Sequence, residues 1–222
     1  MLKIGHRGAG GSAPENTLKS FAEAIKDGAN AVEIDVRQTK DKKLVIFHNE
    51  KLDKLTGQKG YVSDFTLEQI KQLNIEGESI PTFGEAIDFI DSKVEKILVE
   101  IKEPGTESEI IKAIKAKKLE DRVIIISFHA DALKKVRALD SHIETGFIYA
   151  SYSDPIGIAK ELGVSYLLPL YRFTHSKDID RAHENNLKII VWTVNTKKEM
   201  EDFIKKGVDG IATDYPSILA KL

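Results

Sequence analysis

Residues 188–213 read KIIVWTVNTKKEMEDFIKKGVDGIAT, and this stretch contains one complete copy of the pattern that decides the fold. The β-branched run at 188–194 predicts a buried strand. Apolar residues at helical spacing follow, Gly207 marks the end of that helix, and 210–213 forms a second apolar run. Two short strands joined by one helix predict a parallel β-α-β unit.

The same alternation extends over the rest of the 222 residues. Each predicted strand is followed by a segment of helical period, and eight such units predict an α/β protein with a closed TIM (β/α)8 barrel. An open doubly wound sheet is the alternative, but it gives no reason for eight even units. The predicted strands are 2–5, 31–36, 96–101, 123–127, 144–148, 165–169, 188–194 and 210–213.

One segment breaks the alternation. Only six polar residues, 38–43, separate the second strand from the apolar run 44–47, and a parallel crossover needs about a dozen or more. We therefore expect 44–47 to return antiparallel, as a hairpin that brings His48 back to the level where the hairpin began. Residues 49–79 then form a small insertion, and we expect residues 1–222 to make a single domain.

Helix-capping signals mark where several helices begin. Asn16 is the expected N-cap of the first helix. The Thr66–Gln69 and Thr82–Glu85 pairs match the capping-box pattern, and they predict helix starts in the insertion and directly after it.

Composition excludes several classes of function. Lysine plus arginine number 33 and aspartate plus glutamate 35, so the net charge of −2 argues against nucleic acid or a polybasic membrane surface as the main partner. The absence of cysteine excludes disulfides, zinc thiolates and a thiol nucleophile. No apolar run approaches the ~18 residues of a membrane-spanning helix. We expect a soluble, cytoplasmic protein with no stable membrane insertion.

Ionisable residues gather at the predicted carboxyl ends of the strands, where TIM barrels carry out their chemistry. Side chains at i and i+2 of a strand share a face, so Glu33 points with Asp35, and Glu100 points with Lys102. If the apolar residues between them face the helices, three carboxylates converge on the barrel axis. Because each buried ion carries a large desolvation cost, a divalent cation is the expected partner. An all-oxygen ligand set favours Mg²⁺ or Ca²⁺.

The structural alternative is that these inward carboxylates only pair with Lys102, Arg7 or Arg37. Two histidines at neighbouring strand ends, His6 and His48, favour chemistry instead, because imidazole titrates near neutral pH and suits general acid–base catalysis. Arg7 is the expected phosphate ligand of the first loop. His142, His175 and His183 are interpreted as loop or helix-surface residues, and His129 stays ambiguous because it lies just past the fourth predicted strand.

Seven motifs together resemble those of the glycerophosphodiester phosphodiesterases. In chain order they are His6-Arg7-Gly8, Pro14-Glu15-Asn16-Thr17, Glu33-Ile34-Asp35-Val36, His48, Glu100-Ile101-Lys102, Trp192-Thr193-Val194-Asn195 and Gly210-Ile211-Ala212-Thr213-Asp214. The resemblance spans the chain from His6 to Pro216, and the combination is far more specific than any one motif.

The resemblance implies a TIM barrel whose insertion follows the second strand, here at 49–79. It implies hydrolysis of small-molecule glycerophosphodiesters to sn-glycerol 3-phosphate and an alcohol. It also implies that Glu33, Asp35 and Glu100 hold the divalent metal.

Further roles follow from the same resemblance. His6 and His48 would be the acid–base pair, and Arg7 and Lys102 would contact the phosphate. Glu15 would support the site from the first loop.

This chain departs from the family pattern at two places. The residue after His48 is usually aspartate and here is Asn49, which would orient the imidazole more weakly. The hairpin turn usually carries glycine where this chain has Lys42, and we expect the turn to change while the chemistry does not.

Several alternatives stay open at the level of sequence. Trp192 either stacks on the glycerol or is a core aromatic of the barrel. A lysophospholipase D acting on lipid-like diesters would use the same site, as would a non-catalytic barrel that binds glycerol phosphate. The lipid alternative needs an apolar rim, and the insertion offers only Leu52, Leu55, Tyr61, Val62 and Phe65. The alcohol, the metal and the oligomeric state, a homodimer included, are not readable from the residues.

Overall fold

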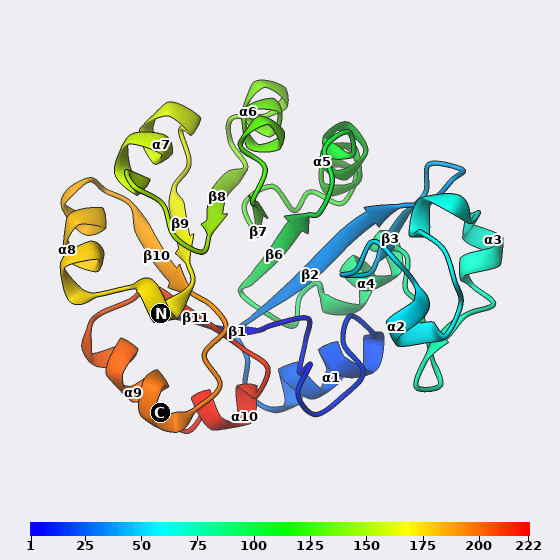
Figure 1. Ribbon diagram of the computed structural model, residues 1–222, viewed down its shortest axis with the longest axis horizontal. Coiled ribbons are helices and arrows are strands. Elements are labelled where there is room, and N and C mark those ends of the chain that lie inside the picture. Colours follow the sequence, from blue (N-terminus) through cyan, green and yellow to red (C-terminus); the bar gives the residue numbers. More distant parts are fainter.

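The computed structural model describes residues 1–222 and contains a closed barrel of parallel strands (Figure 1). Neighbouring strands follow the order β1-β11-β10-β9-β8-β7-β6-β2, and β1 also pairs with β2, which closes the cylinder. The predicted TIM barrel is therefore confirmed. The barrel strands are β1 (Leu2–Gly5), β2 (Ala31–Gln38), β6 (Lys96–Ile101), β7 (Val123–Ser127), β8 (Glu144–Tyr149), β9 (Tyr166–Pro169), β10 (Lys188–Val191) and β11 (Gly210–Thr213).

Helices surround the barrel and cover the outer face of its strands (Figure 1). Two large apolar clusters fill the space between helices and strands, because each strand directs alternate side chains outward. The helices are α1 (Leu18–Lys26), α4 (Phe83–Ile90), α5 (Glu107–Ala116), α6 (Ala130–Leu139), α7 (Pro155–Leu162), α8 (Ser176–Glu184), α9 (Lys197–Lys205) and α10 (Pro216–Leu219), and a 3₁₀ helix, η2 (Tyr171–Phe173), follows β9.

The interior of the barrel is packed with apolar side chains. Ile4, Leu98, Ile126, Ile148 and Leu168 belong to one buried cluster contributed by five different strands. This packing separates two polar ends: Lys96 and Lys188 pair with Glu144 where the strands begin, and the acids lie where the strands finish.

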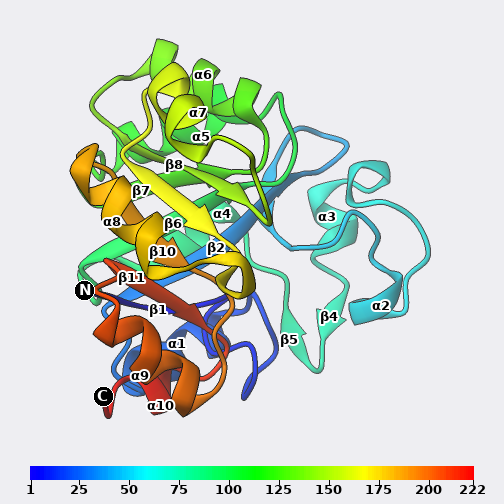
Figure 2. The same cartoon turned by 60° about the vertical axis from the view of Figure 1, so that its left-hand side comes forward.

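The hairpin and the insertion lie at one side of the barrel (Figure 2). Strand β3 (Leu44–Ile46) runs antiparallel to β2, as the short connection predicted. The residues that follow have a small apolar core of their own, which includes Phe47, Leu52 and Val62. The elements of the insertion are α2 (Asp53–Thr56), the 3₁₀ helix η1 (Val62–Asp64), α3 (Leu67–Ile70), β4 (Asn74–Ile75) and β5 (Glu78–Ser79).

Two local predictions need correction. Strand β10 ends at Val191 and not at 194, because its partner β9 ends at Pro169 and leaves only an isolated bridge beyond that point. Asn16 does not cap α1, since the side chain of Thr17 accepts from the Ser20 amide. Lys42, at the hairpin turn, adopts a left-handed φ of 61°, a region that favours glycine.

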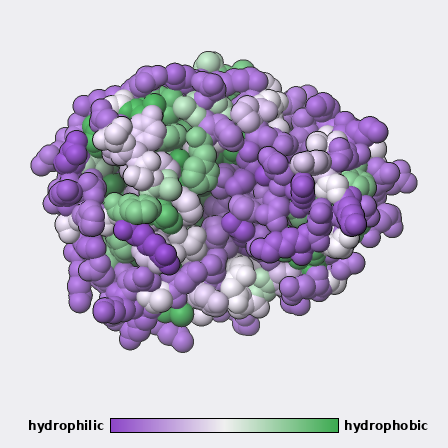
Figure 3. All heavy atoms as spheres, in the orientation of Figure 1, coloured by the Kyte–Doolittle hydropathy of each residue, from purple (hydrophilic) through white to green (hydrophobic).

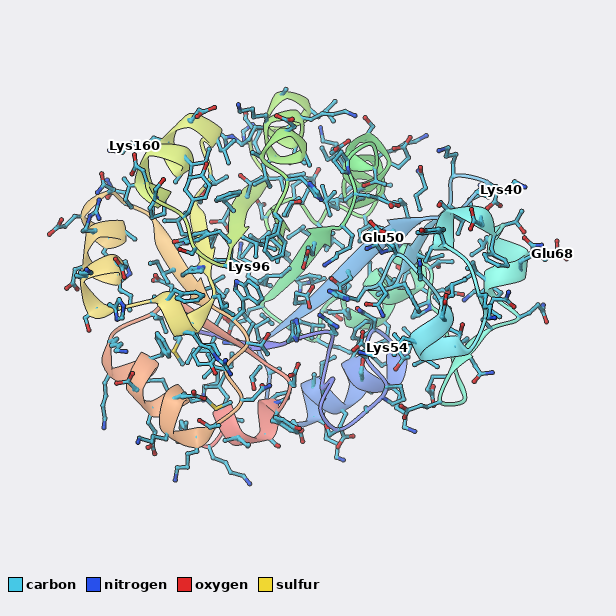
Figure 4. All side chains as sticks on the ribbon, viewed as in Figure 1. Lys40, Glu50, Lys54, Glu68, Lys96 and Lys160 are labelled. Atoms are coloured by element: carbon cyan, nitrogen blue, oxygen red, sulfur yellow. The ribbon has the colours of Figure 1, made fainter.

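Charged side chains cover the outside of the molecule (Figure 4). Lys40, on the β2–β3 hairpin, and Glu68, on α3, lie at the insertion end, and Lys160, on α7, lies at the opposite side of the view. No helix is both long enough and apolar enough to cross a membrane.

We predict that Thr17→Ala destabilises the protein by about 1 kcal/mol, because it removes the side chain that caps α1. The free energy of unfolding in urea measures the loss. Lys19→Ala, an exposed change in the first turn of α1, is the control and should stay near wild type. An unchanged free energy for Thr17→Ala would mean that this cap does not stabilise the helix.

Candidate active site

Three carboxylates converge at the mouth of the barrel. Glu33 and Asp35 point inward from β2, and Glu100 points inward from the neighbouring β6, where it is the register partner of Asp35. One oxygen from each lies within 4.8 Å of the others. The three residues are 3%, 1% and 8% exposed, so the convergence expected from their i, i+2 spacing places three acids in a buried cluster.

Two cations and two amides hold this cluster together. The Lys102 ammonium lies 2.7 Å from a Glu100 oxygen and 3.4 Å from an Asp35 oxygen. The Arg7 backbone N–H donates to Glu33 at 2.9 Å, and its guanidinium lies 3.4 Å from Asp35. Asn16 donates its side-chain N–H to Asp35 at 2.7 Å. Lys102 and Arg7 thus each contact two of the three acids.

The three acids respond differently to this environment. Burial, together with the charges of its two acidic neighbours, raises the pKa of Glu33 well above its usual value. Burial and the charge of Asp35 likewise raise the pKa of Glu100 to about 7. Burial opposes ionisation of Asp35 too, but Lys102 and Arg7 outweigh it and lower the pKa of Asp35 to about 2. Three carboxylates thus share two cations, Lys102 and Arg7, and burial disfavours the charged forms of Glu33 and Glu100.

The residues of this cluster fit a divalent cation. Glu33 Oε1 and Asp35 Oδ1 are buried and have no hydrogen-bond partner, which is unusual for buried carboxylate oxygens. Glu100 adds a third oxygen at the same point. Three carboxylates without sulfur or imidazole ligands are the donor set of a hard cation such as Mg²⁺ or Ca²⁺.

The first loop brings Arg7 over the cluster. Its guanidinium donates to Glu15 at 3.0 Å, so Glu15 positions Arg7 from the outer side while Asp35 lies on the inner side. Arg7 Nε is buried and has no hydrogen-bond partner. That nitrogen lies 3.4 Å from the Asp35 carboxylate. Arg7 also lines the cavity, where its guanidinium can bind a phosphate oxygen.

His6 directly follows β1, and a carboxylate fixes its ring. Its Nδ1 lies 2.7 Å from an oxygen of Asp214, which follows β11. Asn195 donates to the second oxygen of Asp214 at 2.6 Å and accepts from the Asp214 backbone N–H at 2.9 Å. With Nδ1 engaged in this way, Nε2 is the nitrogen of His6 left for a substrate.

His48 reaches the same cavity from the hairpin. Its Nδ1 lies 2.9 Å from the side-chain oxygen of Asn49, so the neutral amide still orients the ring. Burial lowers the pKa of His48, and the cationic side chains of Arg7 and Lys102 oppose protonation further, while Asp35 acts in the other direction.

The opposite wall of the cavity is apolar. Leu98, Ile126 and Trp192 line it together with Phe128, whose ring meets the Trp192 indole edge-to-face at 5.6 Å. The indole N–H of Trp192 donates to the Leu168 carbonyl at 2.7 Å, so the ring offers a substrate only its apolar surface. Figure 3 shows this division, with apolar surface over the strands labelled β8 to β10 and polar surface toward the insertion.

The nine residues expected at the site all lie at this mouth, and eight of them touch either the cavity or the carboxylate cluster, with Glu15 behind Arg7. Sequence reasoning missed two contacts to them, from Asn16 to Asp35 and from Asp214 to His6, and the hydrogen bonds by which Asn195 holds Asp214. Asn16 was interpreted as a helix cap, and the pairing of His6 with Asp214 joins residues 208 positions apart. The sequence signal that could have identified Asn16, Asn195 and Asp214 is that each lies in one of the seven motifs shared with the family.

A closed (β/α)8 barrel with acids, cations and histidines at the carboxyl ends of its strands has the arrangement typical of TIM-barrel enzymes. The sequence profile of the glycerophosphoryl diester phosphodiesterase family matches residues 6–218. The chain therefore belongs to that family.

Individual relatives agree with this assignment. A glycerophosphodiester phosphodiesterase of Caldanaerobacter subterraneus is 39% identical, and the alignment covers 100% of this chain and 97% of the relative. One from Bacillus altitudinis is 31% identical over 100% and 98%. A phosphodiesterase of Oleispira antarctica, solved in complex with the product sn-glycerol-3-phosphate, superposes with a TM-score of 0.90 at 29% identity, covering 98% of this chain and 94% of that one. The resemblance inferred from the motifs, and the prediction of a phosphodiesterase, are confirmed.

We predict that Asn49→Asp raises the pKa of His48, because a carboxylate in place of the amide favours the protonated imidazole. Asn49→Ala, which removes the acceptor, is the control and should give a midpoint no higher than wild type. The pH titration of the His48 ring signals by NMR measures both variants. A midpoint for Asn49→Asp at or below the wild-type midpoint would contradict the expected contact.

Proposed function

We propose that this protein hydrolyses glycerophosphodiesters to sn-glycerol 3-phosphate and an alcohol, with one divalent cation, Mg²⁺ or Ca²⁺, and that residues 1–222 form one such phosphodiesterase domain. The observation that carries the proposal is the buried cluster of Glu33, Asp35 and Glu100, with one oxygen of each within 4.8 Å of the others. The product bound to the Oleispira relative supports the same substrate class.

The chain's own cations would bind the phosphate. A phosphodiester carries one negative charge, and charge on its non-bridging oxygens increases in the transition state. Arg7 and Lys102 line the cavity beside the cluster, where donors already in place stabilise that charge without reorganisation. A divalent cation held by the three carboxylates supplies further positive charge to the same oxygens.

The two histidines would move the protons. In the proposed sequence the 2-hydroxyl of the glycerol attacks phosphorus, the bond to the alcohol oxygen breaks, and water then opens the resulting cyclic phosphate. His48, whose pKa is lowered by burial, would take the proton of the attacking hydroxyl. His6, whose Nδ1 is engaged by the Asp214 carboxylate, would give a proton from Nε2 to the departing alcohol. The second step reverses these proton transfers.

The decisive assay measures glycerol 3-phosphate released from glycerophosphocholine and related diesters. We predict activity with Mg²⁺ or Ca²⁺, loss of at least about 100-fold in EDTA, and recovery when the cation is restored. His6→Ala and His48→Ala, controlled by their far-UV spectra, should each lose about 100-fold or more.

Full activity in EDTA would refute the proposed requirement for a divalent cation. No turnover of any diester, combined with tight binding of glycerol 3-phosphate, would identify a binding protein in place of an enzyme.

A second candidate is lysophospholipase D activity on lipid-like diesters. The observation in its favour is the apolar wall, which comes from β6, β7 and the residues directly after β7 and β10. It does not come from the insertion, where Leu52 and Val62 are buried in the insertion's own core. Phe128, on this wall, is 44% exposed. Its ring would offer apolar surface to an alkyl chain beside the cavity.

Rates on lysophosphatidylcholine and on glycerophosphocholine separate the two candidates. We predict that Phe128→Ser lowers kcat/KM for the lysophospholipid about 10-fold and changes that for the soluble diester less than about threefold. Exposed Tyr61→Ser, on the insertion, is the matched control and should leave both rates near wild type. Equal losses on both substrates would mean that the apolar wall does not select lipids.

A further inference from the structure

Arg37 is a buried cation that the carboxylate cluster does not use. It shares the inward face of β2 with Glu33 and Asp35, two positions beyond Asp35, and its side chain is only 6% exposed. Its guanidinium is nevertheless not paired with any of the three clustered acids, whose cationic partners are Arg7 and Lys102.

Arg37 instead joins two segments that carry site residues. Its Nε donates to the backbone carbonyl of His48 at 2.9 Å. Its Nη1 donates to Glu103 at 3.3 Å, and the other oxygen of Glu103 accepts from the Gln38 backbone N–H at 2.9 Å. Glu103 follows directly after Lys102, at the end of β6. The guanidinium of Arg37 therefore links the residue after the hairpin, His48, to Glu103 after β6.

The carbonyl of His48 needs such a partner. The last ladder contact of β3 is the Phe47 N–H, which donates to the Asp35 carbonyl at 2.9 Å, and no backbone N–H donates to the carbonyl of His48. Beyond Phe47 the chain leaves the sheet and enters the insertion. The height of the His48 imidazole above the carboxylates thus depends on Arg37.

We propose that Arg37 is a positioning residue that holds His48 in register with the carboxylate cluster. It acts through the His48 backbone and touches neither the substrate nor the metal. The inference rests on the proposed phosphodiesterase activity, and a displacement of about 1 Å at such a site is enough to cost about 100-fold in rate.

The test compares Arg37→Met with Arg37→Lys and Arg122→Met. Arg122 is a matched control, because its guanidinium also donates to a carboxylate and a backbone carbonyl, those of Asp91 and Val94, ahead of β7 at the opposite end of the barrel. We expect Arg37→Met to lower kcat about 10- to 100-fold with KM within about threefold. Arg37→Lys should recover part of the loss, because an ammonium can still reach one acceptor. Arg122→Met should lower the melting temperature and leave kcat within about twofold.

Displacement of His48 is also read directly, from its ring signals by NMR. Shifted His48 signals in Arg37→Met, with unchanged signals in Arg122→Met, support the proposal even if the wild-type protein turns over no diester, an outcome that would refute only the proposed function. Unchanged His48 signals, or a kcat for folded Arg37→Met within twofold of wild type, would overturn the assignment of Arg37. Equal losses of kcat in Arg37→Met and Arg122→Met would overturn it as well.

Discussion

The mutual repulsion of three buried carboxylates is the constraint on which the rest of the mouth depends. Two of them come from one strand and the third from its register partner on the next, so the barrel gives Glu33, Asp35 and Glu100 no freedom to separate. Burial alone would drive all three toward the neutral form. Lys102 and Arg7 keep Asp35 ionised, but one buried oxygen of Glu33 and one of Asp35 accept no hydrogen bond. A divalent cation bound by the three carboxylates would offset their negative charge.

The surrounding groups make sense as supports for this arrangement. The apolar floor of the barrel excludes water from below, so the charges act in a medium of low dielectric constant. Each histidine has its own acceptor at Nδ1, a carboxylate for His6 and an amide for His48. The two rings therefore face one cavity with different partners, and the proposed reaction would use one ring as the acid and the other as the base.

Much of this structure could be predicted from the sequence, because two simple periodicities determine it. Alternating strand and helix segments predicted the barrel, and the i, i+2 spacing of the acids predicted their shared face. Contacts that depend on distant parts of the chain could not be predicted. Asn16 has the composition of a helix cap, and only the approach of β2 makes it a partner of Asp35. The end of β10 depends on where β9 stops, and the Arg37–His48 contact depends on the path of the hairpin.

Calorimetric titration of the metal-free protein with Mg²⁺ and Ca²⁺ tests the central claim most directly. The account predicts one ion bound per chain and the loss of that binding in Glu33→Gln and Glu100→Gln. It also predicts a binding heat that changes with the ionisation enthalpy of the buffer near neutral pH, because Glu100, with a pKa of about 7, must release its proton to act as a ligand. Binding that survives both substitutions, or no binding at millimolar cation, would contradict it.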